Sequence, residues 1–82
     1  RYKPITLGRT SAQDMMAGFF LTMNDRIGTA DGADQVLTLP MSRRDIADSL
    51  GVSIETVSRQ VTALRSEGVL STDGRSVIRL LD

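Results

Sequence analysis

Apolar residues in the second half of the chain follow a helical spacing in two short segments that a glycine separates. In the first segment they share one face of a helix: Ile46, Ala47 and Leu50. In the second segment they recur at i, i+4 and i+7: Val57, Val61 and Leu64. Gly51 lies between the segments and can end a helix by adopting a positive φ angle. The pattern predicts two short helices joined by a tight turn.

Hydroxyl residues mark where both helices begin. Ser42 stands three residues before Asp45, which is the spacing of a capping box, so the first helix is predicted to begin at Arg43. Ser53 caps the second helix, which we expect to run over about residues 54–67. Burial of its apolar positions leaves polar residues on the opposite face: Glu55, Ser58, Arg59 and Thr62. Such a face on the second of two short helices is typical of helix-turn-helix DNA-binding proteins.

The segments on either side of this helix pair indicate a small sheet. Gly68 ends the second helix, and an extended run follows at residues 69–71. Residues 72–75 (Thr-Asp-Gly-Arg) are predicted to form a tight turn in which Asp and Gly both take positive φ, with residues 76–81 as the returning strand. Residues 35–39 are predicted to form a further strand that pairs with this hairpin. We therefore expect an α+β winged helix-turn-helix fold with three helices, a small antiparallel β-sheet and a hairpin wing.

The first third of the chain is predicted to be an amphipathic helix over residues 11–27, capped by Thr10 or Ser11. Its apolar residues recur at i, i+3, i+4, i+7 and i+11: Met16, Phe19, Phe20, Met23 and Ile27. In so small a domain we favour core packing for this stripe over a partner groove or a membrane face. Residues 1–10 show no periodicity, and we expect them to be a hinge from an N-terminal region that is missing here. Residues 11–82 then form the winged helix-turn-helix domain.

Composition excludes several kinds of chemistry. The chain has 82 residues, enough for one domain, and contains neither cysteine nor histidine. Disulfides, thiol redox sites and the usual zinc sites are excluded, so we expect no metal and no cofactor. We also expect no enzyme, because the usual pairing of a nucleophile with a histidine base cannot be assembled. No apolar run is long enough to span a bilayer, and the sequence predicts a cytoplasmic protein without a membrane partner.

The net charge by itself does not favour DNA binding, because ten basic residues are balanced by ten acidic ones and the pI is near 6.4. The placement of the charges is more informative. Arginines occur within the predicted helix-turn-helix and wing: Arg43, Arg44, Arg59 and Arg75. Several aspartates lie upstream of them: Asp14, Asp25, Asp31 and Asp34. We expect modest non-specific affinity for DNA and a dependence of binding on dimerisation.

The run from Pro40 to Leu70, PMSRRDIADSLGVSIETVSRQVTALRSEGVL, with the Thr-Asp-Gly-Arg turn after it, resembles the DNA-binding domain of the CRP/FNR family of transcription regulators. The likeness spans about residues 8–78, is most specific around Glu-Thr-Val-Ser-Arg, and favours the FNR and FixK-like branch. It implies an effector-sensing domain and a dimerisation helix that precede this segment. It also implies a homodimer, double-stranded DNA as the ligand, and contact with RNA polymerase.

The resemblance implies that Glu55, Ser58 and Arg59 read base edges in the major groove. The chemistry is suitable, because a carboxylate can accept from cytosine N4 and a guanidinium can donate to guanine O6 and N7. Ser58 stands where the cyclic-AMP receptor branch has glycine, and Ile54 stands where that branch has arginine. The resemblance therefore favours a TTGAT-like half-site over a TGTGA-like one.

A second group of residues matches positions that touch the DNA backbone in members of that family: Ser42, Arg43, Ser53, Thr56, Gly74 and Arg75. Thr62, on the outer face of the second helix, is assigned the same role. Helix amino termini attract anions in any case. Ser42 and Ser53 could equally serve only as helix caps, and capping is compatible with phosphate binding.

Two plainer interpretations compete with DNA reading. Glu55 and Arg59 could form an i, i+4 ion pair on a solvated helix face, worth about 0.2 to 0.5 kcal/mol. Alternatively, the winged helix could be a protein-protein interaction module that does not read DNA, which the zero net charge favours. Such a module would expose an apolar patch, and the predicted reading face has none. DNA reading is therefore the preferred interpretation.

Overall fold

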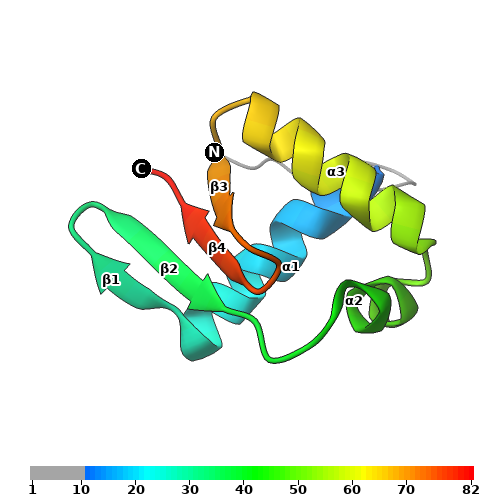
Figure 1. Cartoon of the computed structure of the whole chain (residues 1–82), viewed down its shortest axis with the longest axis horizontal. Coiled ribbons are helices and arrows are strands. Elements are labelled where there is room, and N and C mark those ends of the chain that lie inside the picture. The colour runs from blue at the N-terminus through cyan, green and yellow to red at the C-terminus, as the bar shows by residue number, and fades with distance from the viewer. Residues whose placement is uncertain (1–10) are drawn as a thin grey trace.

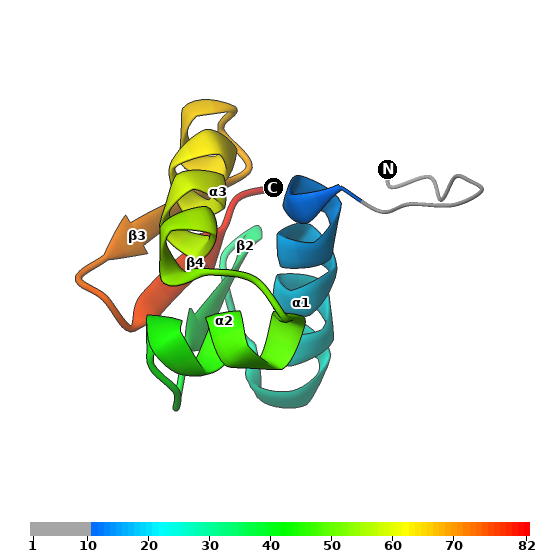
Figure 2. The same ribbon diagram turned by 90° about the vertical axis from the view of Figure 1, so that its right-hand side faces the viewer.

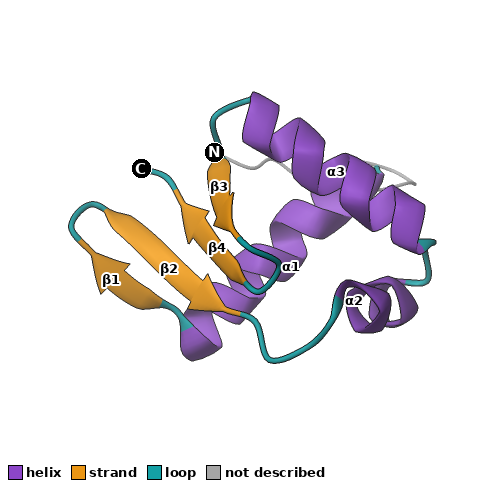
Figure 3. Ribbon diagram, viewed as in Figure 1, coloured by secondary structure: helices purple, strands orange, loops and turns teal. Residues whose placement is uncertain are grey.

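The computed structural model describes residues 11–82, so the predicted hinge at residues 1–10 lies outside the described residues. The helices are α1 (Ala12–Ile27), α2 (Arg43–Leu50) and α3 (Ile54–Ser66) (Figure 1). The strands are β1 (Thr29–Asp31), β2 (Asp34–Thr38), β3 (Leu70–Asp73) and β4 (Val77–Leu80). They form one antiparallel sheet in the order β1-β2-β4-β3. Figure 3 shows α1 passing behind this sheet while α2 and α3 lie beside it. The winged helix-turn-helix prediction is confirmed.

The hydrophobic core lies where α1 meets α3 and the sheet. It consists of these buried side chains: Met16, Phe20, Leu37, Leu39, Ile46, Ala47, Val57, Val61, Leu64, Leu70 and Ile78. Phe19 and Met23 pack against this core, as their spacing predicts. The prediction for Ile27 is wrong, since its side chain is 40% exposed. Ile27 is the last residue of α1, directly before the connection to the outermost strand, and it lies beyond the core.

The turn between α2 and α3 has the predicted geometry. Gly51 has φ +72° and ψ +32°, the left-handed conformation that a residue with a Cβ adopts only at a cost. Its N–H donates to the carbonyl of Ala47, and the N–H of Val52 donates to the same carbonyl. Figure 2 shows α2 crossing α3 steeply, with α1 on one side of α3 and the β3–β4 hairpin on the other. The outer face of α3 is thereby framed by α2 and the hairpin.

The β3–β4 hairpin forms the wing, but its turn differs from the predicted one. Asp73 pairs with Val77 as the last residue of β3, so three residues, 74–76, form the loop. The prediction of a two-residue turn with positive φ at both Asp73 and Gly74 is wrong. Among residues 11–82 only glycines have positive φ, and Gly74 takes +73°. The extra loop residue lets Gly74 alone supply the left-handed conformation, and it places Arg75 at the centre of the loop.

The sheet has one strand that the sequence pattern missed. β1 pairs with β2 across a two-residue turn at Gly32 and Ala33, with Asp31 opposite Asp34. All three residues of β1 are exposed, so it carries no apolar alternation that could have indicated a strand. The Asp31-Gly32 pair was the available indication of a hairpin. The strand predicted at residues 35–39 begins and ends one residue earlier, and it pairs with β4 as expected.

Candidate nucleic-acid interface

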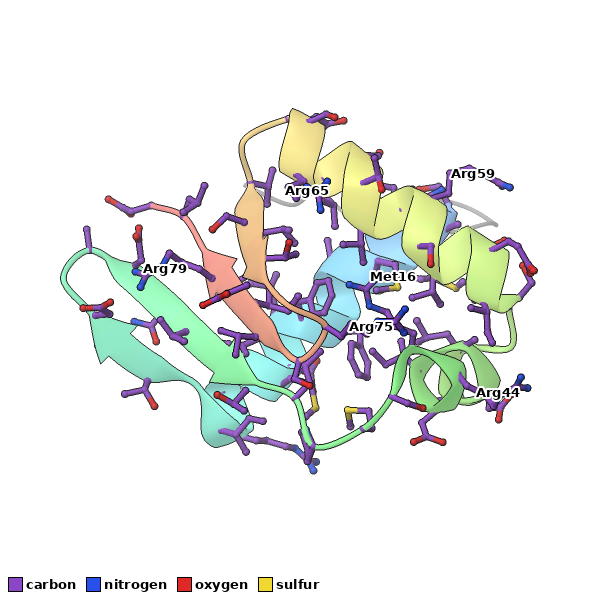
Figure 4. The ribbon with its side chains drawn as sticks, in the orientation of Figure 1. Met16, Arg44, Arg59, Arg65, Arg75 and Arg79 are labelled. Atoms are coloured by element: carbon purple, nitrogen blue, oxygen red, sulfur yellow. The ribbon has the colours of Figure 1, made fainter. Side chains whose placement is uncertain are left out.

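The outer face of α3 carries the side chains that were expected to contact DNA from this helix. All of them are exposed: Glu55, Ser58, Arg59 and Thr62. On the opposite face Val57, Val61 and Leu64 are only 0%, 2% and 4% exposed, which fixes the rotation of the helix. Arg59 projects outward from α3, away from the rest of the molecule (Figure 4). No ion pair within 4.0 Å joins Glu55 to Arg59 in the described part of the chain, so both charges are available to a ligand.

The amino end of α2 is held by the capping box that the sequence predicts. The N–H of Asp45 donates to Oγ of Ser42 over 3.1 Å, and the N–H of Ser42 donates to Oδ2 of Asp45 over 3.2 Å. The capping role of Ser42 is confirmed. Arg43 is the first residue of α2, and its side chain is half-buried. Its backbone N–H lies in the first turn, where helix donors lack intrahelical acceptors.

Ser53 caps α3 in a different way, because its side chain engages Thr56 twice. Oγ of Ser53 accepts from the N–H of Thr56 over 3.1 Å and donates to Oγ1 of Thr56 over 2.9 Å. The two hydroxyls therefore lie together at the amino end of α3, where an anion is attracted.

The wing adds basic side chains beside the amino ends of both helices. Four side chains from α2, α3 and the wing line a hollow of about 230 Å³: Arg43, Ile54, Ser58 and Arg75. Figure 4 places Arg75 between the β3–β4 turn and helices α2 and α3. Nη1 of Arg65 donates to Oγ1 of Thr72 over 3.3 Å, which ties α3 to the first strand of the wing. Sequence reasoning missed the hollow, because no pattern along the chain reports that three elements converge.

The positive charges around the hollow act on one another. Burial lowers the pKa of the Arg43 guanidinium from its ordinary value, and the positive charges of Arg75 and Arg65 lower it further. An arginine side chain nevertheless stays protonated in proteins, so the repulsion is not removed by loss of a proton. Within the described residues, the carboxylates that form ion pairs lie elsewhere, on the sheet. The hollow is therefore suited to an anion.

The ion pairs within residues 11–82 centre on Arg79. Its guanidinium contacts Oδ2 of Asp31 over 2.7 Å and Oδ2 of Asp34 over 3.2 Å, across β4, β2 and β1. Hydrogen bonds to Asp31 and Asp34 raise the pKa of Arg79, whose side chain is half-buried. Figure 4 places Arg79 over the sheet, at the far end of the molecule from Arg59. Two of the ten acidic residues are thus held away from α3.

A metal site or a membrane-spanning helix finds no support in residues 11–82. This part of the chain contains no group of three or more acidic, cysteine or histidine side chains placed to hold a metal ion. It also contains no helix with the length and hydropathy to cross a membrane. The large apolar side chains exposed there lie in α1, or next to β3 and β4, and none is on α3: Leu21, Ile27, Val69 and Leu81.

Comparison with known proteins identifies relatives of the whole domain. A family described as "Crp-like helix-turn-helix domain" matches residues 16–82. The transcriptional activatory protein AadR of Rhodopseudomonas palustris is 44% identical over 80 residues, covering 95% of this chain and 32% of the relative. The nitrogen fixation regulation protein FixK of Bradyrhizobium diazoefficiens is 46% identical over 67 residues, covering 82% and 28%.

A solved structure agrees with these matches. The structure of FixK2 from Bradyrhizobium japonicum superposes with a TM-score of 0.78 at 42% sequence identity, covering 93% of this chain and 36% of that one. The chain thus spans about a third of the length of these relatives. Members of this family are transcription regulators rather than enzymes. The chain belongs to the CRP/FNR family, and it corresponds to the DNA-binding domain of a FixK-like regulator.

Proposed function

We propose that this chain binds double-stranded DNA in a sequence-specific manner, with α3 in the major groove. The observation that carries the proposal is the outer face of α3, where a carboxylate, a hydroxyl and a guanidinium are exposed together on a helix anchored by buried valine and leucine. Major-groove edges present the donors and acceptors that these three groups complement. The similarity to AadR and FixK supports the same conclusion.

Within this proposal Glu55, Ser58 and Arg59 contact base edges. Arg59 donates to O6 and N7 of a guanine, and Glu55 accepts from N4 of a cytosine. Ser58 contributes to reading a thymine-rich outer part of the site. The contacts of the three residues together specify a TTGAT-like half-site. Ile54 supports this choice, because it is half-buried against the core and offers no hydrogen bond to a base.

The remaining contacts in the proposal hold the DNA backbone and set the register of α3. They come from the starts of α2 and α3, the outer face of α3 and the wing: Ser42, Arg43, Ser53, Thr56, Thr62, Gly74 and Arg75. Helix amino termini present backbone N–H groups and a positive dipole end to a phosphate. At the start of α3 the hydroxyl groups of Ser53 and Thr56 are hydrogen-bonded to each other, so one phosphate could contact both.

The relatives suggest how the domain acts in a longer protein. We place residues 1–10 as a hinge and residues 11–82 as the DNA-binding domain of a homodimer that assembles through a preceding segment. The related proteins are named as activators and regulators, so this domain would bring a transcription activator to its promoter, where RNA polymerase is the partner. The similarity alone supports these partners.

Selection of bound duplexes from a random-sequence library tests the proposal. Two copies of the chain would be joined by a flexible linker, because two weak half-site contacts gain strongly from effective concentration. The proposal predicts enrichment of paired TTGAT-like half-sites whose centres lie about 34 Å apart, one turn of the duplex. Joined copies carrying Arg59→Ala serve as the control and should lose the guanine preference. Failure of the unaltered protein to enrich any sequence would favour the protein-interaction alternative.

A further inference from the structure

The hollow between the wing and the two helices of the helix-turn-helix is lined by only four side chains, and two of them are arginines from different elements. Arg43 opens α2, Arg75 lies in the loop between β3 and β4, and Ile54 and Ser58 belong to the first turns of α3. No acidic side chain is among the residues that line it. Two guanidinium groups, a hydroxyl and an apolar wall thus surround one volume of about 230 Å³.

Arginines placed this way favour one small anion with several acceptor oxygens. The Arg43 guanidinium is partly desolvated and lies in the field of Arg75 and Arg65, so it is repelled as long as the hollow holds no anion. A guanidinium presents its donors in a planar fork that matches the oxygens of a phosphate. An anion between the two arginines would attract both guanidinium groups and offset their mutual repulsion.

Ser58 connects the hollow with the outer face of α3, which favours DNA as the source of the phosphate. This residue lines the hollow and also belongs to the exposed outer face of α3, where base reading is proposed. A group held between Arg43 and Arg75 therefore lies next to the edge of α3 that would enter the major groove. A duplex seated on α3 would bring a backbone phosphate to that position, and competition with inorganic phosphate distinguishes this source from a free ion.

We propose that Arg43 and Arg75 grip one and the same phosphate of the DNA backbone, so that the wing and the helix-turn-helix bind as a single coupled clamp. The inference rests on the proposed DNA binding, and it adds that the two arginines are not independent contacts. The wing then fixes the register of α3 along the duplex. Arg75 of the wing and Arg43 of the helix-turn-helix bind the same phosphate, which lies beside the base-reading residues of α3. The Arg65–Thr72 hydrogen bond supports the clamp by holding β3 against α3.

A double-mutant cycle tests the clamp, using the 82-residue chain and a short labelled duplex carrying the selected half-site. Arg43→Ala and Arg75→Ala are each expected to weaken binding by about tenfold, and the double variant by only about 10- to 20-fold instead of a hundredfold. The slope of log K against log salt concentration should become smaller in magnitude by about one in the double variant, since one phosphate contact is lost. The matched control pairs Arg44→Ala with Arg75→Ala. Arg44 neighbours Arg43 but does not line the hollow, and this pair should be additive.

Neutral methylphosphonates, placed one at a time along the duplex, locate the contact. The clamp predicts one backbone position at which loss of the phosphate charge removes the effect of both Arg43→Ala and Arg75→Ala on affinity.

Inorganic phosphate at matched ionic strength should compete with the duplex no better than chloride does. Circular dichroism melting verifies folding, and Arg43→Lys and Arg75→Lys, which keep the charge, should retain the salt dependence. Additive losses, a fall of two units, or two separate phosphate positions would overturn the clamp while leaving DNA binding intact. Absence of binding by the unaltered chain would overturn both.

Discussion

Two side chains four residues apart on α3, Glu55 and Arg59, illustrate how residue chemistry separates the competing interpretations. At this spacing on a helix they could pair with each other, yet no ion pair joins them within residues 11–82. Ser58 is exposed beside them, and Val57 and Val61 are buried on the other side of the helix. The polar groups are therefore presented to solvent without internal partners. That arrangement favours a reading face over a self-neutralised surface.

Arg59 gives the first test at this scale. We expect Arg59→Ala to cost about 1 to 3 kcal/mol of binding free energy on the selected half-site, because a bidentate contact to guanine is lost. Affinity for unrelated duplexes should change much less. A binding array that substitutes each base in turn measures both quantities, with Arg26→Ala in the last turn of α1 as the control. Unchanged guanine preference in the Arg59 variant would remove this residue from the reading set.

Ser53 allows capping to be separated from phosphate contact. Aspartate caps helices as well as serine does, so Ser53→Asp should leave the free energy of unfolding within about 0.5 kcal/mol of the original. The added negative charge would face the proposed phosphate and should weaken binding to every duplex, whatever its sequence. Thermal melting and a fluorescence titration report the two effects independently. Equal DNA affinity with an equal melting temperature would show that this helix start does not approach the backbone.

Among the elements, the turn between α2 and α3 was the one that the sequence pattern predicted best. The wing loop and the β1–β2 hairpin were predicted less well. The capping box at Ser42, the left-handed Gly51 and the buried stripe of α3 all follow from local spacing, which the chain displays directly. β1 could not be found by alternation, because its three residues are all exposed and it is held by pairing with β2. The three-residue wing loop depends on strand register, which a short sequence motif does not fix.

The same substitution at two glycines should change stability in opposite directions. A Cβ at Gly51 meets no atom within 4 Å, so Gly51→Ala carries only the cost of φ +72°, about 1 kcal/mol. Gly18 lies inside α1 and is equally open, and Gly18→Ala should stabilise the domain by about 0.5 to 1 kcal/mol. Denaturant unfolding of both variants measures the difference. A stabilising alanine at Gly51 would contradict the left-handed turn that sets the crossing of α2 and α3.

The hollow was the part of the candidate site that sequence could not reveal. Each of its arginines is visible in the sequence, and Arg75 was expected in the wing. Their convergence depends on the order β1-β2-β4-β3, which brings the β3–β4 loop back beside the start of α3. Contacts between residues about thirty positions apart are a property of the topology. Periodicity and capping, by contrast, report only on neighbours along the chain.

At the scale of the whole molecule, the arginines differ in whether they form ion pairs, although the net charge is zero. Arg79 is paired with Asp31 and Asp34 on the sheet, whereas Arg43, Arg59 and Arg75 lie with the helix-turn-helix and wing. A duplex approaching α3 meets guanidinium groups that form no ion pair within residues 11–82, together with the carboxylate of Glu55, while the ion-paired charges lie at the other end. A chain with zero net charge can therefore still bind DNA, with modest affinity.

Modest affinity has a consequence for assembly. We expect the 82-residue chain to sediment as a monomer and to bind a single half-site weakly. Two copies joined by a flexible linker should bind a paired site about 10² to 10⁴ times more tightly. Analytical ultracentrifugation and titrations at fixed salt measure both properties. The expectation fails if the single chain forms a tight dimer, or if joining two copies brings no gain on a correctly spaced site.

The most direct measurement for the account as a whole is a two-dimensional NMR titration of the isotope-labelled chain with a duplex carrying the selected half-site. Backbone amide shifts should concentrate at the exposed positions of α3, the starts of α2 and α3, and the wing loop at residues 74–76. Amides of the β1–β2 hairpin, around Asp31 and Asp34, should stay unchanged. Shifts centred on that hairpin or on α1, with α3 unaffected, would contradict the proposal that the outer face of α3 reads DNA.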